Sequence, residues 1–249
     1  RVWPAIALAD FDPAAPGLES AVGRGGNQLT LYSATGGVLW TRSPFSGGEV
    51  RSLAAADIDA NGDLEIVVGR ASSGGTLQVS VYEHDGSVRP GWPARRTGEP
   101  GTGAGMYNEN LAVGDLDGDG QAEIYAPTDT HYITALHPNG NQLLASSVYG
   151  LSGGLQKTWA QVGVHVDQVA DLRGFANCGS EHRPNFANAA PAIADLDGNG
   201  TLELVVPGDV YNCAIGDPAG DLYYLPWILR RDRTRWAEGG FDWTAIPPA

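Results

Sequence analysis

Three short stretches of the sequence gather oxygen-bearing side chains at a fixed spacing. Residues 57–65, 115–123 and 195–203, here called loops 2, 3 and 4, each read D-x-D-x-[DN]-G-x-x-E. Two carboxylates about 4 Å apart repel by roughly 4 kcal/mol at an effective dielectric near 20, which opposes such a cluster. The pattern therefore predicts loops that bind a cation.

Ca²⁺ suits these loops because it is a hard ion that takes roughly six to eight oxygen ligands, and the glycine at position six allows the sharp turn that wraps them around it. Positions one, three and five would supply side-chain oxygens, position seven its backbone carbonyl, and position nine a carboxylate. We expect about three Ca²⁺ sites. The predicted ligands are Asp57, Asp59, Asn61, Asp63 and Glu65 in loop 2, Asp115, Asp117, Asp119, Gln121 and Glu123 in loop 3, and Asp195, Asp197, Asn199, Thr201 and Glu203 in loop 4.

The flanks of these loops exclude the helical calcium motif. An EF-hand needs a bidentate glutamate at position twelve and a helix on each side, whereas position twelve here is Val68, Ala126 or Val206. The flanking residues alternate as strands do. Magnesium fits less well, since it prefers to keep several of its waters.

A fourth, altered copy of the pattern stands near the start of the chain and is called loop 1. Asp10, Asp12 and Glu19 remain there, but Pro13 and Pro16 interrupt the loop. We expect loop 1 to bind no metal. The four copies recur at intervals of roughly 50 to 80 residues, which is the length of a supersecondary repeat rather than of a hairpin.

Each repeat unit contains four predicted strands. A small-residue apolar strand (4–10, 52–58, 110–116, 191–196) precedes the acidic loop, and a β-rich segment (19–23, 64–69, 122–127, 202–208) follows it. A third alternating strand (28–33, 77–83, 132–137, 221–229) leads through a glycine-bearing turn to a fourth strand near Trp40, Trp92 or Trp236. Four strands per tandem unit are typical of a propeller blade. The small residues suit the crowded centre where blades converge.

The sequence thus predicts an all-β fold, a β-propeller of four-stranded blades with calcium-binding loops. Residues 1–249 would form a single propeller or part of one, with repeats starting near 3, 50, 108 and 188 and an insertion near 150–188. The tryptophans either fill the space between neighbouring blades, which we favour, or form a ligand platform. The four visible repeats either close an unusually small ring or form part of a larger one, whose open ends further blades or copies would cover.

Composition narrows the partners. The net charge is −14, and about half of the 29 acidic residues lie in the four loops. No basic stripe exists to neutralise phosphates, so a nucleic-acid partner is disfavoured. No apolar run is long enough to span a membrane.

The chain begins at Arg1 and enters a strand almost at once, which favours a processed protein or an excised fragment. We expect the protein to be secreted or on the cell surface.

The two cysteines, Cys178 and Cys213, stand in polar, loop-like surroundings on either side of loop 4. These settings favour a disulfide between them, with two buried free thiols as the alternative. A structural zinc site is disfavoured because no paired cysteine or histidine spacing accompanies them.

The acidic loops and the segments LEIVVG, AEIYAP and LELVVPG that follow them resemble FG-GAP or VCBS repeats, the blades of the integrin α-subunit type of β-propeller and its bacterial relatives. The resemblance covers nearly the whole chain, weakly at 150–188 and beyond 236. It implies an extracellular, calcium-binding propeller. One difference from the family is the ninth position, often aspartate there and the longer Glu65, Glu123 or Glu203 here.

Three functions remain open. The first is a non-enzymatic binding or adhesion scaffold for a protein or glycan, which the resemblance implies. The second is a carbohydrate-active enzyme similar to the polysaccharide lyases, for which His165 and Asp167 in the insertion are candidates, although no catalytic constellation accompanies them. The third is a structural subunit of a surface appendage. We expect a protein that is not an enzyme.

Overall fold

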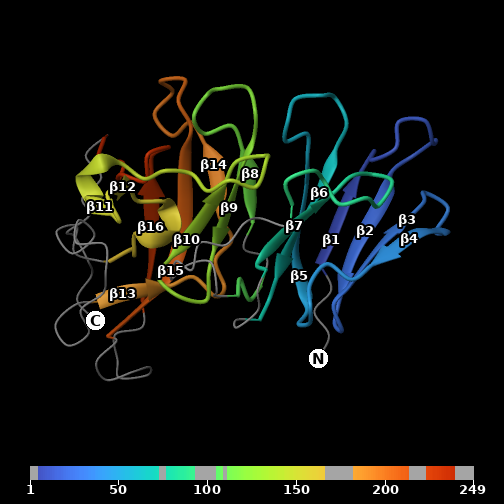
Figure 1. Cartoon of the computed structure of the whole chain (residues 1–249), viewed down its shortest axis with the longest axis horizontal. Helices are drawn as coiled ribbons and strands as arrows, with labels where there is room; N and C mark the ends of the chain where they lie inside the picture. The colour runs from blue at the N-terminus through green and yellow to red at the C-terminus, as the bar shows by residue number, and fades with distance from the viewer. Residues whose placement is uncertain are drawn as a thin grey trace.

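The computed structural model describes residues 5–72, 77–92, 105–108, 111–165, 182–212 and 223–238. Within this part of the chain, antiparallel sheets stand side by side (Figure 1). The helical segments found there are two single 3₁₀ turns, η2 (Ser147–Tyr149) and η3 (Trp159–Gln161). The all-β, propeller-type prediction is therefore confirmed. None of the helical segments in this described part could span a bilayer.

Each acidic loop joins the small-residue strand before it, here called the first strand of the repeat, to the next strand of the same sheet. The first sheet has four strands in the order β1 (Ala5–Ala9), β2 (Glu19–Arg24), β3 (Gln28–Tyr32), β4 (Val38–Arg42). The second contains β5 (Val50–Ala56), β6 (Glu65–Arg70) and β7 (Val79–Tyr82), and the third contains β8 (Ala112–Gly114), β9 (Glu123–Pro127) and β10 (Ile133–Leu136). The fourth contains β14 (Ala192–Ala194), β15 (Glu203–Asn212) and β16 (Tyr223–Leu229), with β13 (His182–Asn185) paired to the far half of β15.

The predicted fourth strand is regular only in the first sheet. In the others it is reduced to one bridge each: Tyr82 with Val88, Leu136 with Gln142, and Leu229 with Arg235. In the second sheet Pro90 follows at once, and a proline lacks the N–H that would continue the ladder. In the third, Leu144 instead bridges to Thr158 and so leaves the sheet.

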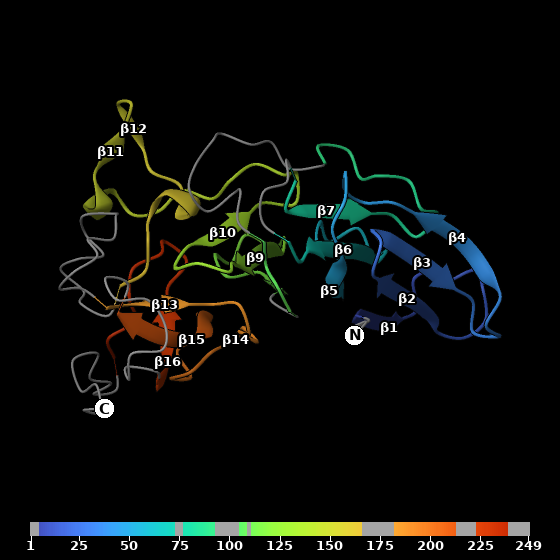
Figure 2. The same cartoon turned by 90° about the horizontal axis from the view of Figure 1, so that it is seen from below.

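The small residues of the first strands allow neighbouring sheets to converge. β5 contacts β1 and β8, and β8 in turn contacts β14, so the four first strands line the inner side of the row (Figure 2). A Cβ atom on Gly23 would lie 2.4 Å from Val50, and one on Gly114 would lie 3.1 Å from Ile193. Side chains at these glycines would push adjacent sheets apart.

Two tryptophans pack between neighbouring sheets, as the favoured of the two interpretations of the sequence predicted. Trp40 is buried against Tyr82 of the second sheet, and its indole N–H donates to the carbonyl of His84 at 2.8 Å. Trp92 is buried in the same way, with its N–H donating to the Pro138 carbonyl of the third sheet at 2.8 Å. Each indole thus binds the turn of the next blade, which fixes the register between sheets.

The described part of the insertion is partly built into the core. Strands β11 (Leu151–Ser152) and β12 (Leu155–Gln156) form an exposed hairpin, after which Trp159 of η3 packs in the cluster shared by the third and fourth sheets. The other insertion residues that the sequence pointed to, Asp167 and Cys178, lie outside the described residues, as does Cys213.

The first and fourth sheets lie at opposite ends of the row in both views (Figures 1 and 2). In the first sheet, the side chains of Ala5 and Ala7 on β1 are buried, whereas those of Ile6 and Leu8 are exposed. These four sheets do not form a closed ring within the described residues.

Candidate metal centres

All four acidic loops project from the same edge of the sheets, the upper edge in Figure 1. Each leaves the end of an inner strand and re-enters the next strand at a glutamate, since β2, β6, β9 and β15 begin at Glu19, Glu65, Glu123 and Glu203. The strand pairing therefore fixes both ends of every loop. What lies between them is set by the loop's own hydrogen bonds.

Loop 3 folds around the carboxylate of Asp115. That carboxylate accepts backbone N–H groups from Gly118 at 2.7 Å, Asp119 at 3.1 Å and Gly120 at 2.9 Å. Gly118 and Gly120 have φ values of 78° and 91°, a region open to glycine and disfavoured for other residues. The glycine predicted from the metal-loop pattern is thus needed for the turn.

Glu123 stands at the end of loop 3, as the first residue of β9, and is fully buried. Its Oε2 accepts the N–H of Leu116 at 3.0 Å, while its Oε1 has no hydrogen-bond partner within the described part of the chain. The Tyr125 hydroxyl is buried beside this carboxylate, and burial, followed by the charge of Glu123, raises its pKa. Burial, followed by the charge of Asp117 and then by those of Asp119 and Asp115, raises the pKa of Glu123 to about 7. An unpartnered carboxylate oxygen is costly unless something binds it.

The donor atoms of loop 3 converge on one place. Carboxylate oxygens of Asp115, Asp117, Asp119 and Glu123 lie within 4.8 Å of one another. This is a donor set of hard oxygens, which is what Ca²⁺ prefers, and it includes Glu123, whose Oε1 accepts no hydrogen bond from the residues that the structure describes. The residues of loop 3 therefore fit the predicted ion.

Loop 2 has the same backbone frame. Asp57 accepts the N–H groups of Asn61 at 3.0 Å and Gly62 at 2.9 Å, and Glu65 Oε2 accepts that of Ile58 at 2.9 Å. Burial is also the main cause that raises the pKa of Glu65 to about 7. The oxygens of Asp57, Asp59 and Glu65 converge within 4.8 Å, as in loop 3.

Loop 2 differs from loop 3 in holding a cation of its own. The Arg89 guanidinium lies 2.5 Å from Asp59 Oδ2 and 3.2 Å from Glu65 Oε1. Sequence reasoning did not connect this arginine with the loop.

Loop 4 repeats the hydrogen bonds of loop 3, with Gly198, Asn199 and Gly200 donating to Asp195 at 2.8, 3.1 and 2.9 Å. Those bonds, that from Gly200 foremost, lower the pKa of Asp195. Glu203 Oε2 accepts the N–H of Leu196 at 3.1 Å.

The carboxylates of loop 4 are less convergent. Among the described residues Asp195, Asp197 and Glu203 do not form a group like those of loops 2 and 3. The Thr201 hydroxyl lies 3.5 Å from Glu203 Oε1, the oxygen that is unpartnered in loop 3. Among the described residues the structure thus brings together four of the predicted acidic ligands in loop 3 and three in loop 2, and no such group in loop 4.

Loop 1 retains the glutamate but lacks the complete set of ligand residues. Glu19 is fully buried, and its Oε2 accepts the N–H groups of Phe11 at 2.9 Å and Asp12 at 3.2 Å. Asp12 accepts the Ala14 N–H in an ordinary turn. The glutamate that ends the loop, at position nine in loops 2 to 4 and at position ten in loop 1, therefore has a structural role in all four loops, and the recurrence of Glu19 in a damaged loop was the signal for it in the sequence.

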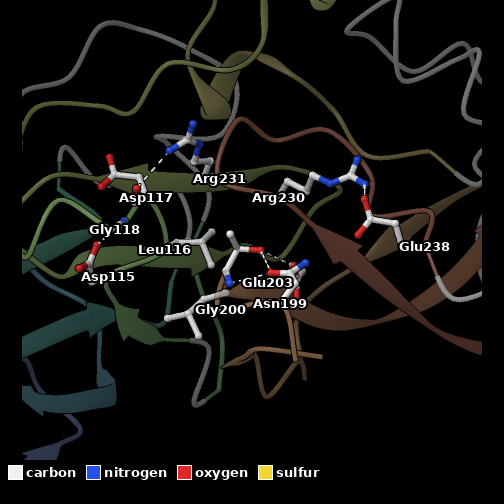
Figure 3. Close-up of a pocket in the computed structure, with 12 residues that line it drawn as sticks. Asp115, Leu116, Asp117, Gly118, Asn199, Gly200, Glu203, Arg230, Arg231 and Glu238 are labelled. Atoms are coloured by element: carbon white, nitrogen blue, oxygen red, sulfur yellow. Dashed lines mark hydrogen bonds and ion pairs between the residues drawn. The ribbon is translucent and has the colours of Figure 1, made fainter. Parts of the chain in front are cut away.

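A cleft of about 650 Å³ separates loops 3 and 4 (Figure 3). Arg231 crosses it, its Nη1 donating to the Asp117 carbonyl at 3.1 Å, while Arg230 pairs with Glu238 on the far wall. The cleft brings the acidic ends of the third and fourth sheets together with two cationic side chains.

The catalytic candidate that the structure describes is buried. His165 has no exposed surface, its ring meets that of His131 edge-on at 5.6 Å, and its carbonyl accepts the Trp227 indole N–H at 3.4 Å. Its place is between the third and fourth sheets rather than in the cleft.

The sheets and their acidic edge define an all-β protein of the propeller type. Residues 57–126, which span loops 2 and 3, match the family model described as FG-GAP-like repeat, in agreement with the resemblance that the sequence predicted. A search of the curated proteins finds no match. Among solved structures, the chain is similar to the exotype rhamnogalacturonan lyase YesX, with 14% identity and a TM-score of 0.45, over 94% of this chain and 40% of that one.

The raised pKa values of Glu65 and Glu123 predict how the stability of the metal-free protein depends on pH. Glu65 and Glu123 ionise near pH 7 in the folded protein but near 4.5 when unfolded, so folding takes up protons in between. Their stabilising contribution is complete below pH 4.5 and is lost as pH rises through 7. We expect the melting temperature in EGTA to fall by a few degrees between pH 5.5 and 8, given about 2–4 °C per kcal/mol for a chain of this size.

The control for this prediction is Glu123→Gln, which removes one of the two titrating groups and leaves the histidines unchanged. Its melting temperature in EGTA should depend less on pH than that of the wild type. Equal slopes for the two proteins would show that Glu123 does not titrate in this range.

Proposed function

We propose that the chain is a calcium-binding β-propeller domain that binds a protein or glycan outside the cell without transforming it. The observation that carries the proposal is the group of four carboxylates in loop 3, which lie within 4.8 Å of one another and include the fully buried Glu123, whose Oε1 accepts no hydrogen bond in the described part of the chain. A cation there would satisfy that oxygen and offset the repulsion within the loop.

Loops 3 and 4 are the proposed sites with an unobstructed frame. In loop 3 the cation would be held by Asp115, Asp117, Asp119 and Glu123. In loop 4 the same backbone hydrogen bonds present Asp195, Asp197 and Asn199. Bound calcium would supply positive charge at the acidic edge, beside the cleft that Asp115, Asp117 and Glu203 help to line.

The cleft is the part of this edge that could receive a ligand. Calcium in loop 3, together with Arg230 and Arg231 on the opposite side, would make its walls attractive to anionic groups, whereas the metal-free loops would repel them. We therefore propose acidic glycans or acidic protein segments as the ligand class. The exposed apolar residues of β1, Ile6 and Leu8, are a second surface that further blades or copies of the chain would cover.

Retention on a glycan array and on a panel of acidic polysaccharides tests the binding role. In calcium, we expect the protein to be retained without forming unsaturated sugar ends, and we expect EGTA to reduce retention at least about tenfold, because a like-charged cleft replaces a neutralised one. Asp115→Asn should weaken retention in calcium, while Asp12→Asn, in loop 1, should not.

Other outcomes favour the rival functions. Appearance of unsaturated ends would show lyase activity and contradict a non-enzymatic role. No retention in calcium, together with regular filaments in electron micrographs, would support a structural subunit of a surface appendage.

A further inference from the structure

Loop 2 is the acidic loop whose carboxylates already have a cationic partner in the described part of the chain. Arg89 reaches it from the segment after β7 with only 12% of its side chain exposed. One nitrogen, Nη2, lies 2.5 Å from Asp59 Oδ2, and the other, Nη1, lies 3.2 Å from Glu65 Oε1. These are side-chain oxygens that a bound cation in this loop would use.

The guanidinium is held from two further directions. Nη1 also donates to Glu83 Oε1 at 3.1 Å, and Nε donates to the Pro138 carbonyl of the third sheet at 3.4 Å. A planar guanidinium with several donors in a fixed arrangement is well suited to bridge carboxylates in this way. Arg89 is therefore part of the packed structure rather than a mobile surface charge.

The repeat itself shows that this arginine is special to the second sheet. The backbone N–H groups of Arg89, Leu143 and Trp236 donate to Val81, Ala135 and Ile228, so the three residues occupy equivalent positions in successive sheets. The equivalent residues are apolar in the third and fourth sheets. By the same test Glu83 corresponds to His137 and Arg230, so the partner of Arg89 is also peculiar to the second sheet.

We propose that Arg89 takes the place of Ca²⁺ in loop 2, and that this loop stays ordered without metal and does not bind calcium in the range that fills loops 3 and 4. An ion within Ca²⁺–oxygen bonding distance of Asp59 and Glu65 would lie close to the guanidinium, and like charges repel. Calcium would therefore have to displace a largely buried arginine from three carboxylates. The inference rests on the proposed function, because it presumes that the other loops bind calcium.

Equilibrium dialysis of the purified chain against Ca²⁺ tests the proposal directly. Arg89→Leu places at this position the residue that the third sheet has there. The variant should bind about one more Ca²⁺ per chain than the wild type, because Asp57, Asp59 and Glu65 would then be free to bind a cation. Arg24→Leu is the matched control. It removes an arginine that bonds the Tyr32 hydroxyl, makes the same change in net charge, and should leave the bound calcium unchanged.

A second substitution keeps the test decisive even where Arg89→Leu destabilises the fold. Asp57→Asn in the wild-type background should leave the bound calcium unchanged, whereas Asp115→Asn should remove about one ion. In the Arg89→Leu background, Asp57→Asn should abolish the gained ion.

The outcomes separate this inference from the proposed function. If Asp57→Asn removes an ion from the wild type, or if folded Arg89→Leu gains none while Asp115→Asn still loses one, Arg89 is not the counter-ion of loop 2. If neither the wild type nor any variant binds Ca²⁺, the proposed calcium function fails and this inference fails with it.

Discussion

Adding EGTA to the calcium-saturated protein, with loops 3 and 4 both occupied, is expected to lower its melting temperature by about 6–20 °C. Extracellular calcium modules often have Kd values of roughly 10⁻⁴ to 10⁻³ M, so ~10 mM calcium exceeds Kd by about 10–100-fold. Binding to the folded state then stabilises by about 1.4–2.7 kcal/mol per site. Chelation removes this contribution and leaves the buried Glu123 close to three other carboxylates with no cation between them.

Controls separate metal binding from general salt effects. Calcium should restore the melting temperature, and magnesium should restore it poorly because it dehydrates reluctantly. Asp115→Asn should lose part of the calcium-dependent shift, and Asp12→Asn should keep all of it, since loop 1 lacks the ligand set. A melting temperature that EGTA leaves unmoved, with no calcium found by metal analysis, would remove the chemical basis of the proposed function.

Trp159→Ala is expected to destabilise the protein by about 3–5 kcal/mol, the usual cost of truncating a large buried aromatic side chain. Trp159 has no exposed surface and packs against Tyr125 with ring centroids 5.2 Å apart. Its backbone N–H also donates to Leu143 at 3.0 Å, so the start of the insertion is fixed to the third sheet. Chemical denaturation monitored by circular dichroism measures the loss.

Leu155→Ala is the control within the same insertion. Leu155 is 74% exposed in the β11–β12 hairpin, so its truncation should change stability by no more than about 0.5 kcal/mol. Similar losses for the two variants would contradict the view that the insertion contributes to the core through Trp159.

Local signals predicted most of the architecture. The alternating strands and the D-x-D-x-[DN]-G-x-x-E loops are patterns within about ten residues, and both recur in the structure because short-range spacing decides them. The fourth strands were only partly right. Whether such a segment pairs along its length depends on the residues that follow, such as Pro90 in the second sheet and the Leu144 bridge to Thr158 in the third.

The candidate sites show where sequence reasoning stops. It named the loop ligands from their spacing. Only the structure shows that one oxygen of each glutamate, Oε2, accepts the backbone N–H of Leu116, Ile58 or Leu196. Sequence reasoning also missed Arg89, which is 24 positions beyond Glu65 and reaches loop 2 through the pairing of β6 with β7. Superposing the repeats position by position would have exposed an arginine where Leu143 and Trp236 stand in the other sheets.

Because a different tryptophan lies at each of two contacts between neighbouring sheets, here called junctions, tryptophan fluorescence can report on each junction separately. Trp40 spans the first junction and Trp92 the second, and each donates its N–H to a carbonyl across it. Parting of one junction would expose that indole to water and shift its fluorescence emission to longer wavelength. In variants that keep a single junction tryptophan, emission would follow the separation of two neighbouring sheets, whereas the loss of calcium from the loops at the edge would leave it unchanged for as long as the sheets stay joined.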